Sequence, residues 1–214
     1  MEPCDENAQT ITIPAEMPMI VLPDVHLLPG CMLPLCIFEK RYLLMLAHAL
    51  ESNRMFCVGN REGVDPGGSD MISPNSTAGL VRCCIQQEDG TSQLLLLGIK
   101  RIRITGWAQV KPFRIARVEE ISTVVESMEE ARRLQKEALS IFKVQGDEDA
   151  REMRDMLEQN DDPEMTCDVL CYHFTHCPKL QQKLLGEPLL EKRWRLLIAA
   201  LKKMRRGRDG DKIK

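Results

Sequence analysis

The pattern of apolar and polar residues changes near residue 122. Before that point, apolar residues come in short runs bounded by proline, glycine and polar residues, a pattern typical of strands. These runs are Met19–Leu22, Leu35–Phe38, Met55–Gly59 and residues 79–87, 92–100 and 113–121. Asp89-Gly90 separates two of them and predicts a hairpin turn. Beyond residue 122 the apolar spacing becomes helical, so the order of elements predicts an α+β protein.

Other segments of the first half differ from this strand pattern. Residues 41–50 carry apolar side chains at helical spacing and predict one helix. Residues 60–77 collect glycine, proline and serine and predict a loop. Ile102 and Ile104 continue the alternation after the hairpin, and we expect Gly106-Trp107 and Pro112 to interrupt it.

Four helices are predicted in the second half, over residues 128–142, 148–158, 162–174 and 190–204. The third has the clearest start, because Asp162 can cap a helix whose first residue is Pro163.

Residues 17–38 are apolar enough and long enough to imitate a membrane span. The stretch contains four prolines: Pro18, Pro23, Pro29 and Pro34. Each proline removes a helical hydrogen bond, so we expect a short strand and an extended, buried loop in place of a membrane helix.

Composition and charge fit a soluble globular protein. The chain has 214 residues, a formal net charge of -3 and only 4% aromatic residues. Residues 119–164 are strongly acidic and residues 179–214 strongly basic. Two interpretations stay open: attraction between antiparallel helical faces, or a basic patch over residues 202–208 that binds an acidic partner.

The nine cysteines are odd in number and irregularly spaced, a pattern that does not look like a disulfide framework. This pattern favours a reducing environment. Residues 1–16 lack the basic start and apolar centre of a signal peptide. We therefore expect a cytoplasmic protein.

One group of side chains suggests a metal site, although its spacing is unfavourable. It consists of Cys167, Cys171, His173, His176 and Cys177. Zinc prefers four such ligands, but one helix and its end cannot surround an ion, so we expect buried cysteines and a helix-terminal histidine.

Other chemistry has less support. Cys83 and Cys84 lie in a predicted strand and point to opposite faces, so at most one can enter a site; His26 and His48 are the histidines that such a thiol would need nearby. The chain has neither a phosphate-binding G-x-x-x-x-G-K-[ST] sequence nor a G-x-G-x-x-G sequence after a strand. We expect no cofactor, no bound nucleotide and no metal.

Three blocks of sequence resemble the N-terminal, substrate-binding domain of Lon proteases. Residues 19–23 and 29–42 resemble its opening, which has a strand, a P-G loop, an L-P-L-x-I-F-E segment and R-Y at the start of a helix. Residues 79–104 resemble its hairpin, which ends in G-x-x-R-[FI]-x-I, and residues 162–197 are similar to its C-terminal helices. The resemblance extends over about residues 17–204.

The resemblance implies a PUA-like β pseudo-barrel followed by a C-terminal helical bundle. We expect a flexible segment over residues 1–16, the barrel over 17–121, the helices over 122–206 and a basic flexible tail over 207–214. The motif residues are expected to determine the fold: Pro29, Gly30, Pro34, Phe38, Glu39, Arg41 and Tyr42. Pro29-Gly30 would turn the chain, Phe38 and Tyr42 would anchor strand to helix, and Glu39 and Arg41 would pair or cap the helix.

Full Lon proteases continue into ATPase and proteolytic modules, whose motifs are missing before Lys214. The resemblance therefore implies a free-standing, non-catalytic protein that recognises polypeptides, with an apolar groove on the barrel or between barrel and bundle. The alternative is RNA binding, because PUA-like barrels can bind RNA and residues 100–117 are rich in cations. These cations are Lys100, Arg101, Arg103, Lys111, Arg114 and Arg117.

Overall fold

A computed structural model describes residues 11–65, 68, 70–141, 153, 155–175 and 177–211. Seven strands precede most of the helices, as the change near residue 122 predicted. The strands are β1 (Glu16–Leu22), β2 (Met32–Ile37), β3 (Met55–Val64), β4 (Asp70–Ile72), β5 (Asn75–Gln86), β6 (Ser92–Gln109) and β7 (Arg114–Glu120). The helices are α1 (Lys40–Glu51), α2 (Met128–Ile141), α4 (Pro163–Phe174), α5 (Pro178–Leu185) and α6 (Leu190–Asp211).

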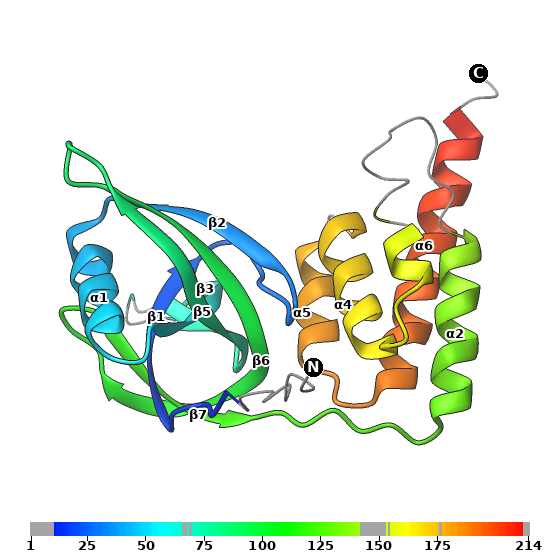
Figure 1. Ribbon diagram of the computed structural model, residues 1–214, viewed down its shortest axis with the longest axis horizontal. Coiled ribbons are helices and arrows are strands. Elements are labelled where there is room, and N and C mark those ends of the chain that lie inside the picture. Colours follow the sequence, from blue (N-terminus) through cyan, green and yellow to red (C-terminus); the bar gives the residue numbers. More distant parts are fainter. Residues whose placement is uncertain are drawn as a thin grey trace, which may run out of the picture.

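Five of the strands close into a barrel. Neighbouring strands follow the order β1-β7-β6-β5-β3, and β1 also pairs with β3 in parallel, which closes the ring. β2 pairs with the first half of β6, and β4 pairs with the end of β3. Figure 1 shows the barrel on the left, the C-terminal helices on the right and α1 on the barrel side away from those helices. This arrangement confirms the expected α+β fold class.

The Asp89-Gly90 hairpin is confirmed, but two other expectations for the strands were wrong. β6 continues through Gly106 and Trp107, because the irregularities in its pairing with β7 absorb them as bulges. Residues 60–77 are not one loop, since β3, β4 and β5 all extend into this range. Polar Ser76 and Thr77 are accepted in buried β5 because their hydroxyls donate to the carbonyls of Val58 and Leu27.

The predicted helix starts are largely correct. The Asp162 carboxylate accepts from the backbone N–H groups of Glu164 and Met165, as a capping residue does. The separate helix α5 was missed, and α6 continues past the boundary set at residue 206. Of the predicted helix over residues 148–158, residues 153 and 155–158 are helical, and the rest lies outside the described residues.

Three apolar cores hold the elements together. One fills the barrel around Met17 and Ile102, and a second packs α1 against the face of β2, β5 and β6 that carries Leu96. The third lies among the C-terminal helices around Trp194 and Leu170. Among the helices of the described residues, none is long and apolar enough to cross a membrane.

Candidate functional site

The side of β2, β5 and β6 that is turned away from α1 presents apolar side chains to solvent. Leu33, Leu35 and Ile37 of β2 pack into the α1 core, so the alternate residues of β2 point the other way. Their pairing partners on β6, and the partners of those on β5, share this direction. We call this surface the hairpin face; its apolar members are Met32, Pro34, Cys36, Leu80, Cys83, Ile85, Leu95 and Leu97.

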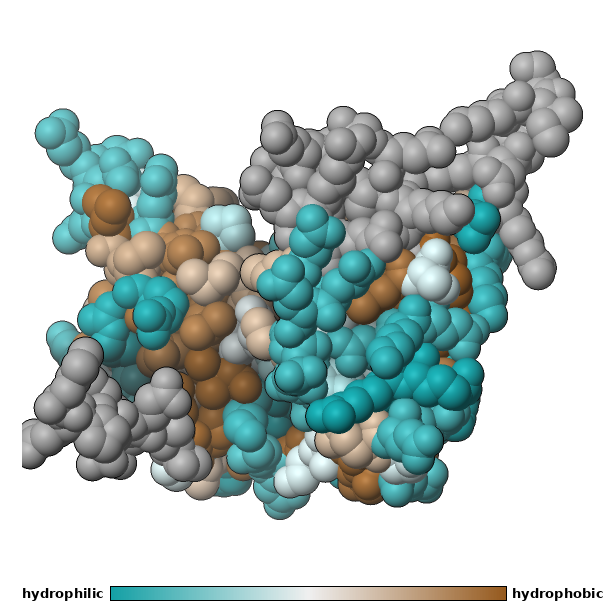
Figure 2. Space-filling view, turned by 45° about the vertical axis from the view of Figure 1, so that its right-hand side comes forward, coloured by the Kyte–Doolittle hydropathy of each residue, from teal (hydrophilic) through white to brown (hydrophobic). Residues whose placement is uncertain are grey.

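The hairpin face is continuous and mostly apolar. Ile85 is 63% exposed and Met32 39% exposed, and Leu95 and Leu97 are half-buried between them. Gln93 is a polar member opposite Cys36 and Ile85, and the exposed Arg82 lies beside Cys83 at the β5 bulge. Figure 2 shows hydrophobic surface gathered on the barrel half, in the hollow beside the helices. Contiguous exposed apolar side chains, as on the hairpin face, are typical of a binding surface.

The turn at Pro29-Gly30 brings the chain into β2, as expected. Gly30 has a φ of 76°, which favours glycine, and its N–H donates to the Gly98 carbonyl at 2.9 Å. A Cβ on Gly98 would lie 2.1 Å from the Leu28 carbonyl oxygen, so only glycine allows this loop to approach β6. The loop, and with it the start of the hairpin face, depends on both glycines.

The other motif residues show one error. The Tyr42 hydroxyl donates to the Val21 carbonyl and accepts from the Val21 N–H, so Tyr42 anchors α1 to β1 as expected. Glu39 and Arg41 form an exposed ion pair at 2.8 Å. Phe38 was expected to be a buried anchor but is 68% exposed. Strand alternation gives the core position to Ile37 and turns Phe38 to solvent.

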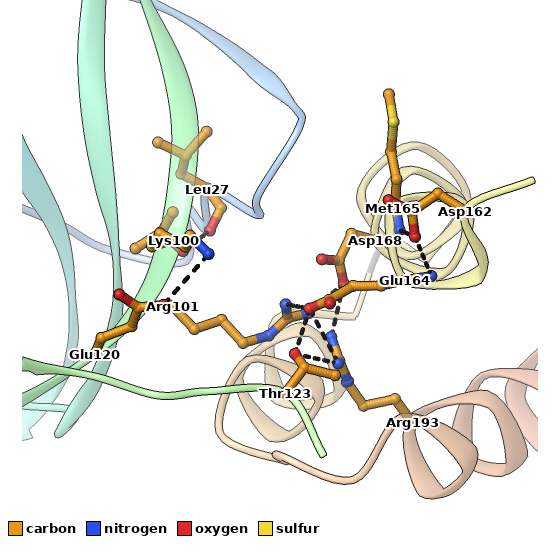
Figure 3. A network of polar contacts seen from close by, with 11 residues as sticks. Leu27, Lys100, Arg101, Glu120, Thr123, Asp162, Glu164, Met165, Asp168 and Arg193 are labelled. Atoms are coloured by element: carbon orange, nitrogen blue, oxygen red, sulfur yellow. Dashed lines mark hydrogen bonds and ion pairs between the residues drawn. The ribbon is translucent and has the colours of Figure 1, made fainter. Parts of the chain in front are cut away.

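A buried charge network joins the barrel to the bundle (Figure 3). Arg101 of β6 binds Glu164 and Asp168 of α4, and Arg193 of α6 binds the same two carboxylates. Burial alone would raise the pKa of Glu164, but the Thr123 hydrogen bond and the two guanidinium groups hold that pKa below its usual value. A cavity of about 290 Å³ borders this network, with Pro29, Gly30 and Met165 in its wall.

Four of the six cations of residues 100–117 are engaged by carboxylates of the chain, which weakens the case for RNA binding. Arg101 is buried in the network, and three others pair with carboxylates: Lys100 with Glu120, Arg114 with Asp70 and Arg117 with Glu16. Within the described part of the chain, only Arg103 and Lys111 of the six have no ion pair. Little unpaired positive charge is left for a phosphate backbone.

The cysteine–histidine group is dispersed. Cys167 and Cys171 are buried in the bundle core, where burial raises the pKa of Cys171 to about 12 and that of Cys167 well above its usual value. His173 is exposed, Cys177 precedes α5, and His176 lies outside the described residues. No three metal-binding side chains converge in the part of the chain that the structure describes.

The thiols Cys83 and Cys84 point to opposite faces, as expected. Cys83 belongs to the hairpin face and Cys84 packs against the α1 core. The two histidines considered as their partners are engaged elsewhere. His26 contacts Asn60 and Gln182, and the His48 ring packs against Phe113.

An apolar groove was expected from the sequence, but the residues of the hairpin face were not named, although a signal was present. Met32–Ile37 is apolar at both alternating positions, whereas a strand with one solvated face alternates with polar residues. An apolar residue at every position of a strand on the edge of a sheet indicates a second contact surface.

Comparison with known proteins gives consistent matches. The profile of the ATP-dependent protease La (LON) substrate-binding domain matches residues 16–203. The chain is 27% identical over 139 residues to a Lon protease of Dictyoglomus thermophilum, covering 64% of this chain and 17% of that protein. It is 24% identical over 176 residues to a Lon protease of Trichlorobacter lovleyi, covering 79% of this chain and 21% of the relative. The chain thus spans about a fifth of these relatives.

Solved structures agree on the fold. The N-terminal domain of Mycobacterium avium complex Lon protease superposes with a TM-score of 0.71 at 17% identity, covering 87% of this chain and 98% of that domain. A Lon N-terminal domain protein from Xanthomonas campestris gives a TM-score of 0.65 at 20% identity, covering 86% of this chain and 97% of the other.

Proposed function

Because the chain belongs to the substrate-binding domain family of the ATP-dependent protease La (LON), we propose that it binds polypeptides on the hairpin face and has no catalytic role of its own. The match to the substrate-binding domain supports a binding role. The observation that carries the choice of site is the continuous apolar surface formed by Met32, Ile85, Leu95 and their neighbours. Unfolded chains expose the apolar side chains that such a surface would cover.

The chemistry of the hairpin face favours apolar over charged ligands. Removing apolar surface from water is favourable by about 25 cal/mol per Å², and this term has no preferred direction. Binding of this kind depends weakly on salt, whereas phosphate contacts weaken steeply as salt rises. The free cysteines of the described residues support a reducing, cytoplasmic setting for this binding.

Fluorescence anisotropy with a labelled, permanently unfolded protein tests the proposal. We expect saturable binding that changes little between low and high salt. Ile85→Lys, which places a charge on the hairpin face, should weaken binding by about tenfold or more, because a lysine cannot be buried there without a partner.

Leu44→Lys is the matched control, since Leu44 is 54% exposed on α1, which covers the opposite side of these strands. It should leave the affinity unchanged. Equal effects of the two substitutions, or no binding by the wild-type protein, would overturn the proposal. Tight binding to a structured RNA that collapses with salt would favour the alternative.

A further inference from the structure

We propose that the hairpin face recognises polypeptides through their apolar side chains alone, without pairing their backbone to the sheet. This inference rests on the proposed function and adds the manner in which the polypeptide is held. The ligand is any segment rich in aliphatic or aromatic side chains, whatever its backbone direction or chirality. The alternative is strand addition, in which an extended peptide joins an exposed sheet edge through main-chain hydrogen bonds.

The free edge of β2 is poorly suited to strand addition. The Cys31 carbonyl accepts from Gly98 of β6, whereas the Met32 carbonyl accepts from the Tyr172 hydroxyl at 2.9 Å. The backbone polar groups of successive residues alternate between the two edges of a strand. Those of Met32, Pro34 and Cys36 therefore point away from β6, toward the free edge. Pro34, the central one, has no N–H to donate, and the carbonyl of Met32 is already engaged by α4.

The second edge bordering the hairpin face is interrupted as well. β5 pairs with β3 only over Thr77–Leu80, and the Val81 N–H then donates to Arg54. The next residue, Arg82, is an extra residue in the pairing of β5 with β6, because Val81 lies opposite Leu96 and Cys83 opposite Leu95. A bulge of this kind twists the strand and disturbs regular pairing at its edge.

Both edges are therefore blunted while the surface between them stays apolar. Side-chain contact with an apolar surface is non-directional, so neither the polarity nor the handedness of the bound chain is fixed by it. A strand-adding site would have the opposite character, because every main-chain hydrogen bond depends on register and chirality.

The test compares one fluorescent peptide rich in leucine and phenylalanine with its all-D enantiomer, using the wild-type protein. We expect dissociation constants within about threefold of each other, because both enantiomers bury the same apolar side chains on the hairpin face. Strand addition would favour the L-peptide by about tenfold or more, because a D-strand twists with the opposite hand and cannot keep regular main-chain hydrogen bonds along an L-strand edge. A preference of that size overturns this inference and leaves the proposed function standing, whereas failure of both peptides to bind overturns the proposed function.

Ile85→Lys serves as the second measurement. It is expected to weaken both peptides by a similar factor, because both occupy the hairpin face. Weakening of the L-peptide alone would show that the D-peptide binds elsewhere and would overturn the inference.

Discussion

The Arg101 guanidinium of the barrel donates a hydrogen bond from Nη2 to Oδ1 of Asp168 in the bundle, and both side chains are 2% exposed or less. The same oxygen lies 3.5 Å from Nη1 of Arg193. Asp168 therefore compensates two buried positive charges that come from different halves of the chain. An isolated buried charge is unfavourable, so the position of the bundle on the barrel depends on this carboxylate.

Asp168→Asn is expected to lower the free energy of unfolding by about 3–5 kcal/mol, because Arg101 and Arg193 then share only Glu164. Urea denaturation measures the change. The matched control is Glu39→Gln in the exposed pair with Arg41, which should cost about 0–1 kcal/mol. Similar losses for the two substitutions would mean that the network does not stabilise the junction.

Tyr42 and Phe38 are expected to differ sharply although both are aromatic and belong to one motif. Tyr42→Phe removes both hydrogen bonds to the half-buried Val21 N–H and C=O groups, which should cost about 1–3 kcal/mol. Phe38→Ala changes an exposed side chain and should stay within about 0.5 kcal/mol. A larger loss for Phe38→Ala, measured by the same denaturation, would restore the anchoring role that the sequence suggested.

Gly98→Ala is expected to destabilise the protein by about 1–3 kcal/mol or more, because overpacking forces backbone to move. The added Cβ would meet the Leu28 carbonyl at 2.1 Å, a contact that no side-chain rotation relieves. Gly106→Ala in the same strand is the control, since no atom lies within 4 Å of its added Cβ. Thermal unfolding of the two variants checks this, and equal midpoints would contradict it.

Sequence reasoning succeeded where the signal is local. Asp89-Gly90 predicted the hairpin and Asp162-Pro163 the start of α4, because a turn and a cap are defined by adjacent residues. Arg101 was counted as a surface cation because its partner Asp168 lies 67 residues further along the chain. The residues of the expected apolar groove could not be named for a similar reason: which alternate positions of β2 face solvent depends on where α1 packs.

His26 is expected to make stability depend on pH below neutrality. Burial lowers its pKa, although the hydrogen bond with Gln182 opposes the shift. The unfolded chain therefore binds a proton near pH 6.5 while the folded protein does not. The contribution of His26 to stability is therefore fully present above pH 6.5. It is lost as the pH falls from 6.5 toward the pKa of His26 in the folded state.

Denaturation midpoints at pH 7.5 and pH 5 measure this effect, since both pH values lie above the ordinary pKa of a glutamate and the pKa of Glu164 is lower still. His26→Gln should reduce the loss between the two pH values. Partial desolvation also lowers the pKa of His173, so His173→Gln measures its separate share. An unchanged pH dependence in His26→Gln would contradict the assignment.

Cys83 and Cys84 provide an internal test of the binding site, because neighbours in a strand face opposite ways. Cys83 is exposed on the hairpin face, whereas Cys84 is half-buried on the α1 side. Burial raises the pKa of the Cys84 thiol, so it should react more slowly with iodoacetamide than Cys83 in the free protein. A bound polypeptide should slow the alkylation of Cys83 and of Cys36, which shares its face, and leave the rate at Cys84 unchanged. Mass spectrometry of the labelled peptides resolves each site, and equal slowing of Cys83 and Cys84 would indicate a general change in the protein and not a ligand on the hairpin face.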